Sequence, residues 1–488
     1  MYVVSPSQIP EIDHYAASVL GIPTEELIAR AGNALAKVIL DNVPQKGHIL
    51  FLCGTGNNGK DGEACAEILQ KEGYGVTVIP VFAKRDHLPE IKERLKDTAC
   101  VVDAILGTGA KFGLPPHLIE IFSLCNHSSA LRISADMPTG IDGEYGTAHP
   151  GTFMADITVT FAAPKIGMLS YPAKQYVGQL IVDDLGLPVD MIENVFPSHC
   201  FCLDDRRAKQ LLPPTSPQDH KGKRGNVALL CGSEQYPGAA LLAAEAALRS
   251  GVGLTTVYAP QGVCDKVQIK LPDAICKSLT LLQECDLSAR LSSYSALVIG
   301  PGWGKRTGLA TLLQNILSTP LHLPIVVDAD AINLLADDQE SSIQLCKNVN
   351  NSLIFTPHPL EFSRLFGGEV AYIQDHRIPV ATQAAKRVGA TVLLKGGASV
   401  IACSDDTVWI NPTGGPALSK GGAGDVLSGL LGGLLAQGLR VPCATALSAY
   451  LHGKAADTLT LQYSPLGVRS ADLPLAIAKE MAHLYFEI

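Results

Sequence analysis

Two glycine-rich stretches contain the residue types needed to bind a phosphorylated ligand or a cation. The first is FLCGTGNNGKDG at residues 51–62, and the second is SKGGAGDVLSG at 419–429. Glycines before a helix leave backbone N–H groups exposed, and the helix N-terminus adds positive potential, so such stretches favour anions. Each stretch also holds a carboxylate, Asp61 in the first and Asp425 in the second. The sequence therefore contains two candidate sites, one in each half.

The first stretch matches two nucleotide-binding motifs incompletely. Gly54, Gly59 and Lys60 fit most of a P-loop, but Asp61 stands where that motif needs a Ser or Thr to ligate Mg²⁺. With Gly56, the glycines also spell the dinucleotide fingerprint G-x-G-x-x-G, which needs an acidic residue at the end of the next strand. A lysine and an arginine follow that strand instead. Both matches are therefore weak.

A polar ligand-binding loop is the third interpretation, and residues after other expected strands favour it. These residues are Asp103, the glycine loop 107–113, Asp136, Thr139 and Lys165. Ligands of open α/β sheets bind outside the carboxyl ends of the strands. Amide, carboxylate and hydroxyl oxygens there suit a hard cation, and the glycine loop suits phosphate. Aspartates are also common at strand ends for structural reasons, so the convergence of these residues indicates the site.

The elements that must position these residues alternate along the chain. Short apolar runs rich in β-formers alternate with helical patterns, which predicts parallel α/β sheets. In the first half we expect strands at 48–53, 76–82, 100–106, 131–136 and 157–162 and helices at 24–42, 61–72 and 116–124. A new series of strands begins at 226–231, after a segment rich in proline and charge. We therefore expect two α/β domains without an internal repeat, residues 1–204 and 205–488.

The composition and charge of the chain exclude several classes of function. A chain of 488 residues is too long for one core, and its net charge of -9 argues against a nucleic-acid partner. The 13 cysteines include no C-x-x-C, which is typical of a reducing compartment. The N-terminal segment lacks a signal-peptide pattern, and the most apolar stretch, 426–439, is shorter than a membrane span. We expect a cytoplasmic homo-oligomer that binds small molecules and no membrane.

Four motifs of the first half, CGTGNNGKDG, VVDAILGTGAKFG, SADMPTGIDGEYG and ADITVTFAAPKIG, resemble the YjeF N-terminal family, the NAD(P)H-hydrate epimerases. The resemblance covers about residues 1–200 and implies a Rossmann-like three-layer αβα domain. It departs from the family at Lys60, where a glycine is usual. It implies that Asn58, Asp103 and Thr139 hold K⁺. It also implies which residues line the binding site of the hydrated nucleotide. These are Asn57, Asn58, Gly59, Lys60, Asp61, Gly107, Thr108, Gly109, Ala110, Lys111, Phe112, Gly113 and Asp136.

Epimerisation of such a hydrate needs a positioned acid–base group. The substrate is a hemiaminal, with a hydroxyl on C6 beside the ring nitrogen N1, and loss and return of that hydroxyl inverts the centre. Asp136 is our first candidate for the proton transfer. Lys165 is the second candidate, although it could equally bind a phosphate.

The second half resembles the ribokinase-like superfamily at SKGGAGDVLSG. GSEQYPGAALLAAEAALRSGVGL, GPGWG, VVDADAINLL, TPHPLEFSRL and KGGAS resemble, within it, the NAD(P)H-hydrate dehydratases, the YjeF C-terminal family, over roughly 205–488. The resemblance implies a ribokinase-like αβα domain that uses Mg²⁺ with ADP or ATP, ADP being implied for a fused chain. Implied contacts to the hydrate are Ala239, Gly302, His358 and Asp425, and implied contacts to the nucleotide are Lys395, Gly396, Gly397, Ala398, Ser399 and Gly424.

Asp425 is the candidate base of the second site. A carboxylate beside a transferred phosphoryl group binds phosphate poorly but can accept the proton of an attacking hydroxyl. Its structural alternative is to cap the helix that begins there. The functional alternative is a small-molecule kinase with a non-catalytic nucleotide-binding N-terminal domain, which would share this anion site. GSEQYPGAA and TPHPLEF favour a dehydratase, and the pair of domains favours repair of hydrated NADH and NADPH.

Overall fold

The chain divides into two compact units, Tyr2–Phe201 and Cys202–Ile488. The structure is a computed structural model that describes residues 2–44, 47–83, 86–109, 113–282, 286–304 and 308–486. The division falls in the short strand β7 (Cys200–Cys202), close to the proline-rich segment where the sequence predicts a boundary. Each unit has its own parallel sheet.

The N-terminal unit is built on a parallel sheet in the order β2-β1-β3-β4-β5-β6. Its strands are β1 (His48–Cys53), β2 (Gly75–Pro80), β3 (Thr98–Ala104), β4 (Leu131–Ala135), β5 (Ile157–Phe161) and β6 (Gln179–Asp183). The strand order reverses between β1 and β3, and such a switch point leaves a crevice at the carboxyl ends of the strands. The fold therefore places the glycine-rich stretch after β1 beside the residues that follow β3.

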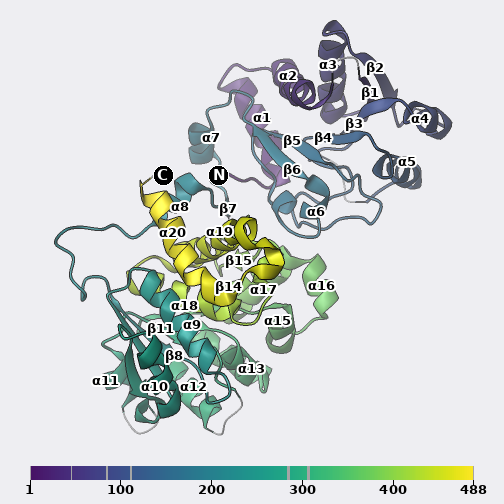
Figure 1. The fold of residues 1–488 in the computed structure, drawn as a ribbon. Coiled ribbons are helices and arrows are strands. Elements are labelled where there is room, and N and C mark those ends of the chain that lie inside the picture. The colour runs from purple at the N-terminus through teal and green to yellow at the C-terminus, as the bar shows by residue number, and fades with distance from the viewer. Residues whose placement is uncertain are drawn as a thin grey trace. The chain divides into compact units, whose positions relative to one another are not determined.

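Helices cover both faces of this sheet (Figure 1). They are α1 (Ile9–Ser18), α2 (Thr24–Asn42), α3 (Asn57–Lys71), α4 (Leu88–Arg94), α5 (Pro116–Asn126), α6 (Lys174–Val177) and α7 (Val189–Val195). In α2 the buried residues recur at helical spacing, as Leu27, Ala31, Leu35 and Ile39. This stripe packs with α3 in one core cluster, while α4 and α5 enclose another on the opposite face. The sheet is thus held between two helical layers.

The C-terminal unit has a larger sheet in the order β10-β9-β8-β11-β12-β13-β14-β15-β16. Its strands are β8 (Asn226–Leu230), β9 (Leu254–Ala259), β10 (Ile275–Ser278), β11 (Ala296–Ile299), β12 (Pro324–Val327), β13 (Ser352–Phe355), β14 (Thr391–Leu394), β15 (Val400–Ala402) and β16 (Val408–Ile410). The strands from β10 to β14 are parallel, and β15 and β16 extend the sheet as antiparallel strands. The order reverses between β8 and β11, which again predicts a ligand crevice.

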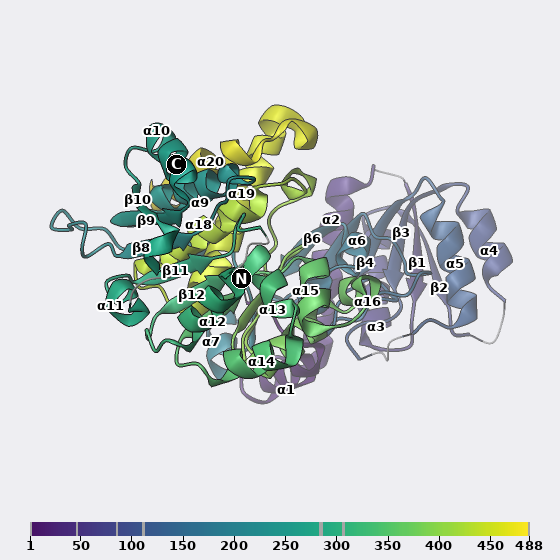
Figure 2. The same cartoon turned by 90° about the horizontal axis from the view of Figure 1, so that it is seen from below.

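Two helical layers also enclose this second sheet (Figure 2). The helices are α8 (Asp205–Leu211), α9 (Pro237–Arg249), α10 (Gln261–Lys270), α11 (Leu287–Leu291), α12 (Leu309–Ser318), α13 (Asp330–Ala336), α14 (Gln339–Asn348), α15 (Pro359–Phe366), α16 (Val370–Asp375), α17 (Arg377–Val388), α18 (Ala423–Ala436), α19 (Val441–Gly467) and α20 (Leu473–Phe486). One core cluster joins α9, α18, α19 and α20 on the same face. No helix of the described ranges is long and apolar enough to cross a membrane.

The glycines within α18 allow it to pack unusually closely. A Cβ added at Gly429 would lie 2.0 Å from the carbonyl oxygen of Ala243 in α9, and one at Gly432 would lie 2.3 Å from a methyl group of Val298 in β11. Glycine inside a helix costs about 1 kcal/mol relative to alanine. Close contact with α9 and the sheet therefore requires residues that weaken the isolated helix. The apolar stretch 426–439 lies largely in this helix, which begins at Ala423 and ends at Ala436.

The strands that the sequence predicts are present with small shifts at their ends, and one prediction about the first site is wrong. The stretch 57–61 is the first turn of α3, with Gly56 as its N-cap, and not a loop before a helix at 61. The two asparagines and glycines are poor helix formers, which is why the pattern indicates a loop. Packing of α3 against α2 and β1 overrides that propensity.

Candidate active sites

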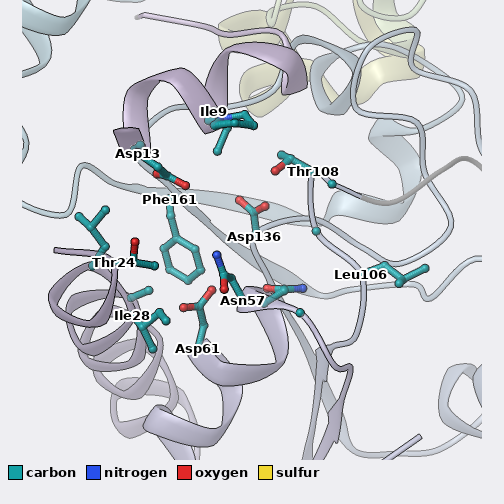
Figure 3. A pocket seen from close by; sticks show the side chains of 18 of the residues that line it. Ile9, Asp13, Thr24, Ile28, Asn57, Asp61, Leu106, Thr108, Asp136 and Phe161 are labelled. Carbon is teal, nitrogen blue, oxygen red and sulfur yellow. The ribbon is translucent and has the colours of Figure 1, made fainter. Parts of the chain in front are cut away.

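A cavity of about 520 Å³ lies at the carboxyl ends of β1 and β3 in the N-terminal unit. Its polar lining includes residues after four strands and one residue from α1. They are Asp13, Thr55, Asn57, Asn58, Asp61, Thr108, Asp136 and Lys165, with Gly107 and Gly109 between them. Figure 3 shows several of these side chains around the same space. The position of this cavity thus agrees with the interpretation of residues 51–62 as part of a polar ligand-binding site.

Asp136 and Lys165 form an ion pair in this cavity. The Lys165 side chain is only 1% exposed, and its ammonium donates to the Asp136 carboxylate, to Thr160 Oγ1 at 3.0 Å and to the Phe161 carbonyl oxygen at 3.1 Å. These partners use all three donors of the ammonium group. Lys165 therefore fixes the position of the Asp136 carboxylate. Because its three donors are used within the protein, its ammonium group is not free to bind a phosphate.

The backbone of Asp136 fixes how its side chain enters the cavity. Asp136 follows β4 with a φ of 66°, in the left-handed region that Asp, Asn and Gly occupy more readily than other residues. Its backbone N–H donates to the Val159 carbonyl oxygen at 2.7 Å, which ties this turn to β5. The carboxylate is thus set by two neighbouring strands.

A second polar group surrounds Asp103 at the end of β3. Asp103 is fully buried and accepts hydrogen bonds from Thr139 N at 2.7 Å, Thr139 Oγ1 at 2.8 Å and Ile105 N at 3.3 Å. Burial raises the pKa of Asp103 to about 6, and the hydrogen bonds oppose the rise. Nearby, both polar atoms of the Asn58 amide are buried without a hydrogen-bond partner among the described residues. An unpaired buried amide is costly, so Asn58 is a candidate ligand group.

Asp61 and Asp13 also face this cavity. Asp61 is 9% exposed. Burial raises the pKa of Asp61 to about 8; the charges of Asp136 and Asp13 add to the rise, and Lys165 opposes it. Burial and Asp136 likewise raise the pKa of Asp13, against Lys165. The sequence analysis missed Asp13, because it lies in a helix that precedes every recognisable motif.

Not every residue predicted for the first site lines the cavity. Lys60 is exposed on the outer side of α3, and Gly59 is packed so that a Cβ would lie 2.1 Å from the Gly54 carbonyl oxygen. Thr139 and Gly113 line a smaller adjoining cavity of about 160 Å³ that shares Gly107 and Thr108 with the first. Ala110, Lys111 and Phe112 lie outside the described residues.

The second site is a more open cavity of about 490 Å³ at the start of α18. Ala239, Gly302 and Asp425, which the family resemblance implies as contacts to the hydrate, line it together. Gly302 has a φ of 63°, and a Cβ there would lie 2.5 Å from the Cβ of Ala239. Asp330 also lines the cavity and accepts a hydrogen bond from Gly304 N at 2.7 Å. The sequence analysis did not single out Asp330, although it lies within the quoted motif VVDADAINLL.

Asp425 carries a carboxyl group that makes no hydrogen bond within the described part of the chain. Burial raises the pKa of Asp425 to about 7, helped by the charge of Asp328 and opposed by Lys395. Lys395 is bonded elsewhere, since its ammonium lies 2.8 Å from Asp328 Oδ1. Ser428 Oγ donates to the other Asp328 oxygen at 2.7 Å. Asp425 is therefore a carboxyl group that gains and loses its proton near neutral pH.

His358 has a structural role that the sequence analysis did not assign to it. It is the N-cap of α15, where its Nδ1 accepts from Leu360 N at 3.2 Å and Glu361 N at 3.3 Å. Glu361 Oε2 in turn accepts from His358 N at 2.9 Å, which completes a capping box. The His358 side chain is 47% exposed and lies outside the lining of the cavity. Contact with a bound hydrate stays a prediction.

The residues predicted to bind the nucleotide follow β14 in a tight turn. Gly396 and Gly397 are exposed, and Ala398 has a φ of 47°. Below the turn the buried guanidinium of Arg377 donates to the carbonyl oxygens of Leu394 at 2.9 Å and Lys395 at 3.1 Å. Gly424, in the first turn of α18, lies close to the start of this turn, because a Cβ there would lie 3.3 Å from Lys395 Nζ. The turn and the α18 N-terminus thus lie on either side of Lys395.

The C-terminal unit shares its fold with proteins of known structure. The C-terminal unit is similar in fold to a ribokinase-like superfamily protein from Enterococcus faecalis, with 23% identity, a TM-score of 0.52, and coverage of 59% of this chain and 98% of that one. It is also similar to the ADP/ATP-dependent NAD(P)H-hydrate dehydratase from Bacillus subtilis, co-crystallised with ATP and Mg²⁺, at 30% identity and a TM-score of 0.53, over 58% of this chain and 97% of that one.

The family models and the full-length relatives identify the family. The model described as NAD(P)H-hydrate dehydratase matches residues 227–479, and that of the YjeF-related protein N-terminus matches 24–96 and 83–167. The bifunctional NAD(P)H-hydrate repair enzyme of Moorella thermoacetica is 33% identical, over 97% of this chain and 95% of its own length. The Escherichia coli relative of the same name is 31% identical, over 94% and 90%. The chain belongs to the family of bifunctional NAD(P)H-hydrate repair enzymes.

Proposed function

We propose that this protein restores hydrated NADH and NADPH through two activities. The N-terminal unit interconverts the R and S hydrates, and the C-terminal unit dehydrates the S form at the expense of ADP, giving AMP and phosphate, or of ATP. The observation that carries the proposal is the arrangement of the second cavity. Ala239, Gly302 and Asp425, from three separated motifs, line one space at the N-terminus of α18.

Dehydration requires a hydroxyl to become a leaving group. Asp425 accepts the proton of the C6 hydroxyl while the terminal phosphoryl group of the nucleotide is transferred to that oxygen. The first backbone N–H groups of α18 have no partner within the helix and stabilise the transferred charge. Mg²⁺ on the nucleotide neutralises further negative charge. The N1 lone pair then expels phosphate, and loss of a C5 proton restores the dihydronicotinamide ring.

The ion pair of Lys395 supports the role of Asp425. Burial and the charge of Asp328 raise the pKa of Asp425 to about 7, and Lys395, which bonds Asp328, opposes the rise, so Asp425 can act as a base at neutral pH. The turn 396–399, in which Gly396 and Gly397 are exposed, and Gly424 offer backbone groups for the nucleotide. ADP is the donor we expect for a chain that carries both activities.

Epimerisation needs only proton transfer at the same hydroxyl, and Asp136 is placed for it. Its carboxylate lies in the cavity and is oriented by Lys165. We propose that Asn58, Asp103 and Thr139 hold K⁺, and the Asn58 amide supports this, because it is buried with no partner among the described residues. Bound there, the ion would supply positive charge beside the substrate phosphates or hydroxyls.

The setting is proposed to be the cytoplasm, which the free thiols of the described cysteines support. We also propose a homo-oligomer, since closed homo-oligomers are the common case for soluble enzymes. Light scattering of the purified protein measures that state directly.

A single absorbance experiment tests both activities. The purified protein is given a mixture of R and S NADH hydrates with Mg²⁺, K⁺ and either ADP or ATP, and recovery of the near-ultraviolet dihydronicotinamide band is followed. Complete recovery at a rate above the spontaneous epimerisation rate is expected, with the faster nucleotide identifying the donor. Recovery that stops when the S form is consumed would contradict the epimerase, and no recovery with either nucleotide would contradict the dehydratase.

A further inference from the structure

The first cavity contains more acidic groups than its positive charge can balance. Asp13 from α1, Asp61 from α3 and Asp136 after β4 all line it, and Lys165 is the only cationic residue among its described lining. Figure 3 shows these three carboxyl groups approaching the same space from different elements. Three carboxylates around one ammonium group repel each other, so ionisation of all three is disfavoured.

Hydrogen bonds decide which carboxyl group stays ionised. Lys165 donates to Asp136 and spends its remaining donors on Thr160 and Phe161. Asp61 accepts no hydrogen bond from any residue in the described part of the chain, although it is 9% exposed. The charged groups that act on it are Asp13, Asp136 and Lys165, and the two aspartates outweigh the lysine. Burial and these two aspartates raise the pKa of Asp61 to about 8, so Asp61 is a carboxyl group of this cavity that keeps its proton at neutral pH.

We propose that Asp61 is the general acid of epimerisation and that Asp136 is the base. This inference rests on the proposed epimerase activity and adds the division of labour between two carboxyl groups. A base alone cannot expel the hydroxyl, because hydroxide is a poor leaving group and needs a proton from a neighbouring acid. The cavity supplies that proton from a side chain that has no other partner.

The step balances as follows. Asp61 donates its proton to the C6 hydroxyl, the C6–O bond breaks, and the N1 lone pair forms an N1=C6 iminium as water departs. A second water attacks C6 from the other face of the ring, forming the new C6–O bond and giving a proton to the Asp136 carboxylate. Water in the cavity returns that proton to Asp61. The enzyme is unchanged, and the configuration at C6 is inverted.

Asp13 is a positioning residue in this scheme. It lies on α1, and its negative charge contributes to keeping Asp61 protonated. Removing the charge of Asp13 makes Asp61 a stronger acid and lowers the pH at which it loses its proton. Asp61 and Asp13 thus have different roles in the same cavity. Asp61 donates the proton, and Asp13 influences the pH at which Asp61 loses it.

The test compares Asp61→Asn, Asp13→Asn and Glu63→Gln in the full-length protein. Glu63 is exposed on the same helix as Asp61, so it is the matched control for the chemical change. Conversion of pure S hydrate to R hydrate is measured by chromatography across pH, and thermal unfolding of each variant reports the folding of the N-terminal unit. For wild type we expect kcat for epimerisation to fall as pH rises through about 8, where Asp61 loses its proton.

Asp61→Asn is expected to lower kcat by about 10²–10⁴-fold, the usual contribution of a general acid, with little change in KM and no alkaline fall. Asp13→Asn is expected to retain more activity and to move the alkaline fall to lower pH. Glu63→Gln is expected to behave as wild type.

Wild-type kcat in Asp61→Asn would overturn the assignment, as would a raised KM with the alkaline fall intact, which would make Asp61 a binding residue. An unmoved alkaline fall in Asp13→Asn would overturn the role of Asp13. Absence of epimerisation in wild type would instead overturn the proposed function itself, so the two failures are distinguishable.

Discussion

Each unit has a lysine that bonds one carboxylate at or beside its cavity, and a second carboxyl group in the cavity that has no hydrogen bond within the described residues. In the N-terminal unit Lys165 bonds Asp136, and Asp61 is left. In the C-terminal unit Lys395 bonds Asp328, and Asp425 is left. The sites differ in where the bonded carboxylate lies. Asp136 lines its cavity, whereas Asp328 lies outside the lining of the second cavity.

This difference corresponds to the chemistry of the two reactions. Moving a proton on and off one hydroxyl needs an acid and a base in the same space, so both carboxyl groups of the first site reach the ligand. Phosphoryl transfer needs one base and a set of N–H donors, and the helix start provides the donors. Lys395 then bonds the buried Asp328 carboxylate, while Asp425 lines the cavity together with Asp330, whose carboxylate accepts a hydrogen bond from Gly304 N.

Asp425→Asn is expected to give the largest effect. The amide cannot accept the hydroxyl proton, so nucleotide-dependent dehydration should fall by about 10²–10⁴-fold. Epimerisation should continue at the wild-type rate, because it uses the other cavity. The near-ultraviolet band measures the first activity, and chromatography of the epimers measures the second. Loss of both activities would contradict two independent sites.

Asp136→Asn is the converse change in the first site. Epimerisation should fall by about 10²–10⁴-fold while dehydration of pure S hydrate is retained. Removing the charge leaves the buried Lys165 unpaired, which costs about 3–5 kcal/mol when a buried pair is broken. Thermal unfolding should therefore accompany the assay. Epimerisation at the wild-type rate in a folded variant would remove Asp136 from the mechanism.

Gly302→Ala tests the close approach that shapes the second cavity. The new Cβ would lie 2.5 Å from Ala239, so one wall must move, and we expect the KM for the hydrate to rise about 10-fold, or about 1.4 kcal/mol of lost binding. Gly389→Ala is the matched control, since Gly389 has the same φ of 63° with no atom within 4 Å of the added Cβ. It should lose only about 1–2 kcal/mol of stability and keep its KM. Equal KM values in the two variants would argue against the contact.

The pH dependence of dehydration should mirror that of epimerisation. Asp425 acts as a base and must be ionised, and its pKa is raised to about 7. The rate at saturating substrate should therefore fall as pH decreases through about 7, whereas epimerisation should fall as pH increases through about 8. A rate-versus-pH profile for each activity measures both. A dehydration rate that does not change as pH passes through about 7 would contradict the role of Asp425 as the base.

The sequence predicts the two α/β units and most parallel strands, because short buried strands between helical patterns are a local signal. Asp136 was singled out as a carboxylate at a strand end and Asp425 as one at a glycine-rich helix start, whereas Gly302 came from the family resemblance alone, and the ligand contacts of all three stay predictions. The sequence does not predict the contribution of Asp13, because only the fold brings α1 to the cavity. The helical start of α3 at Asn57 was missed for a similar reason, since tertiary packing decides it.

The glycines of α18 have a consequence for how this chain can change over generations. Gly429 touches α9 one turn away from Asp425, and no substrate contact is needed for a larger residue there to displace the base. Selection on catalysis therefore constrains residues that lie wholly within the core. Fewer substitutions in α18 are therefore neutral than its apolar composition suggests. Variation in this helix is best interpreted as variation in the position of the active site.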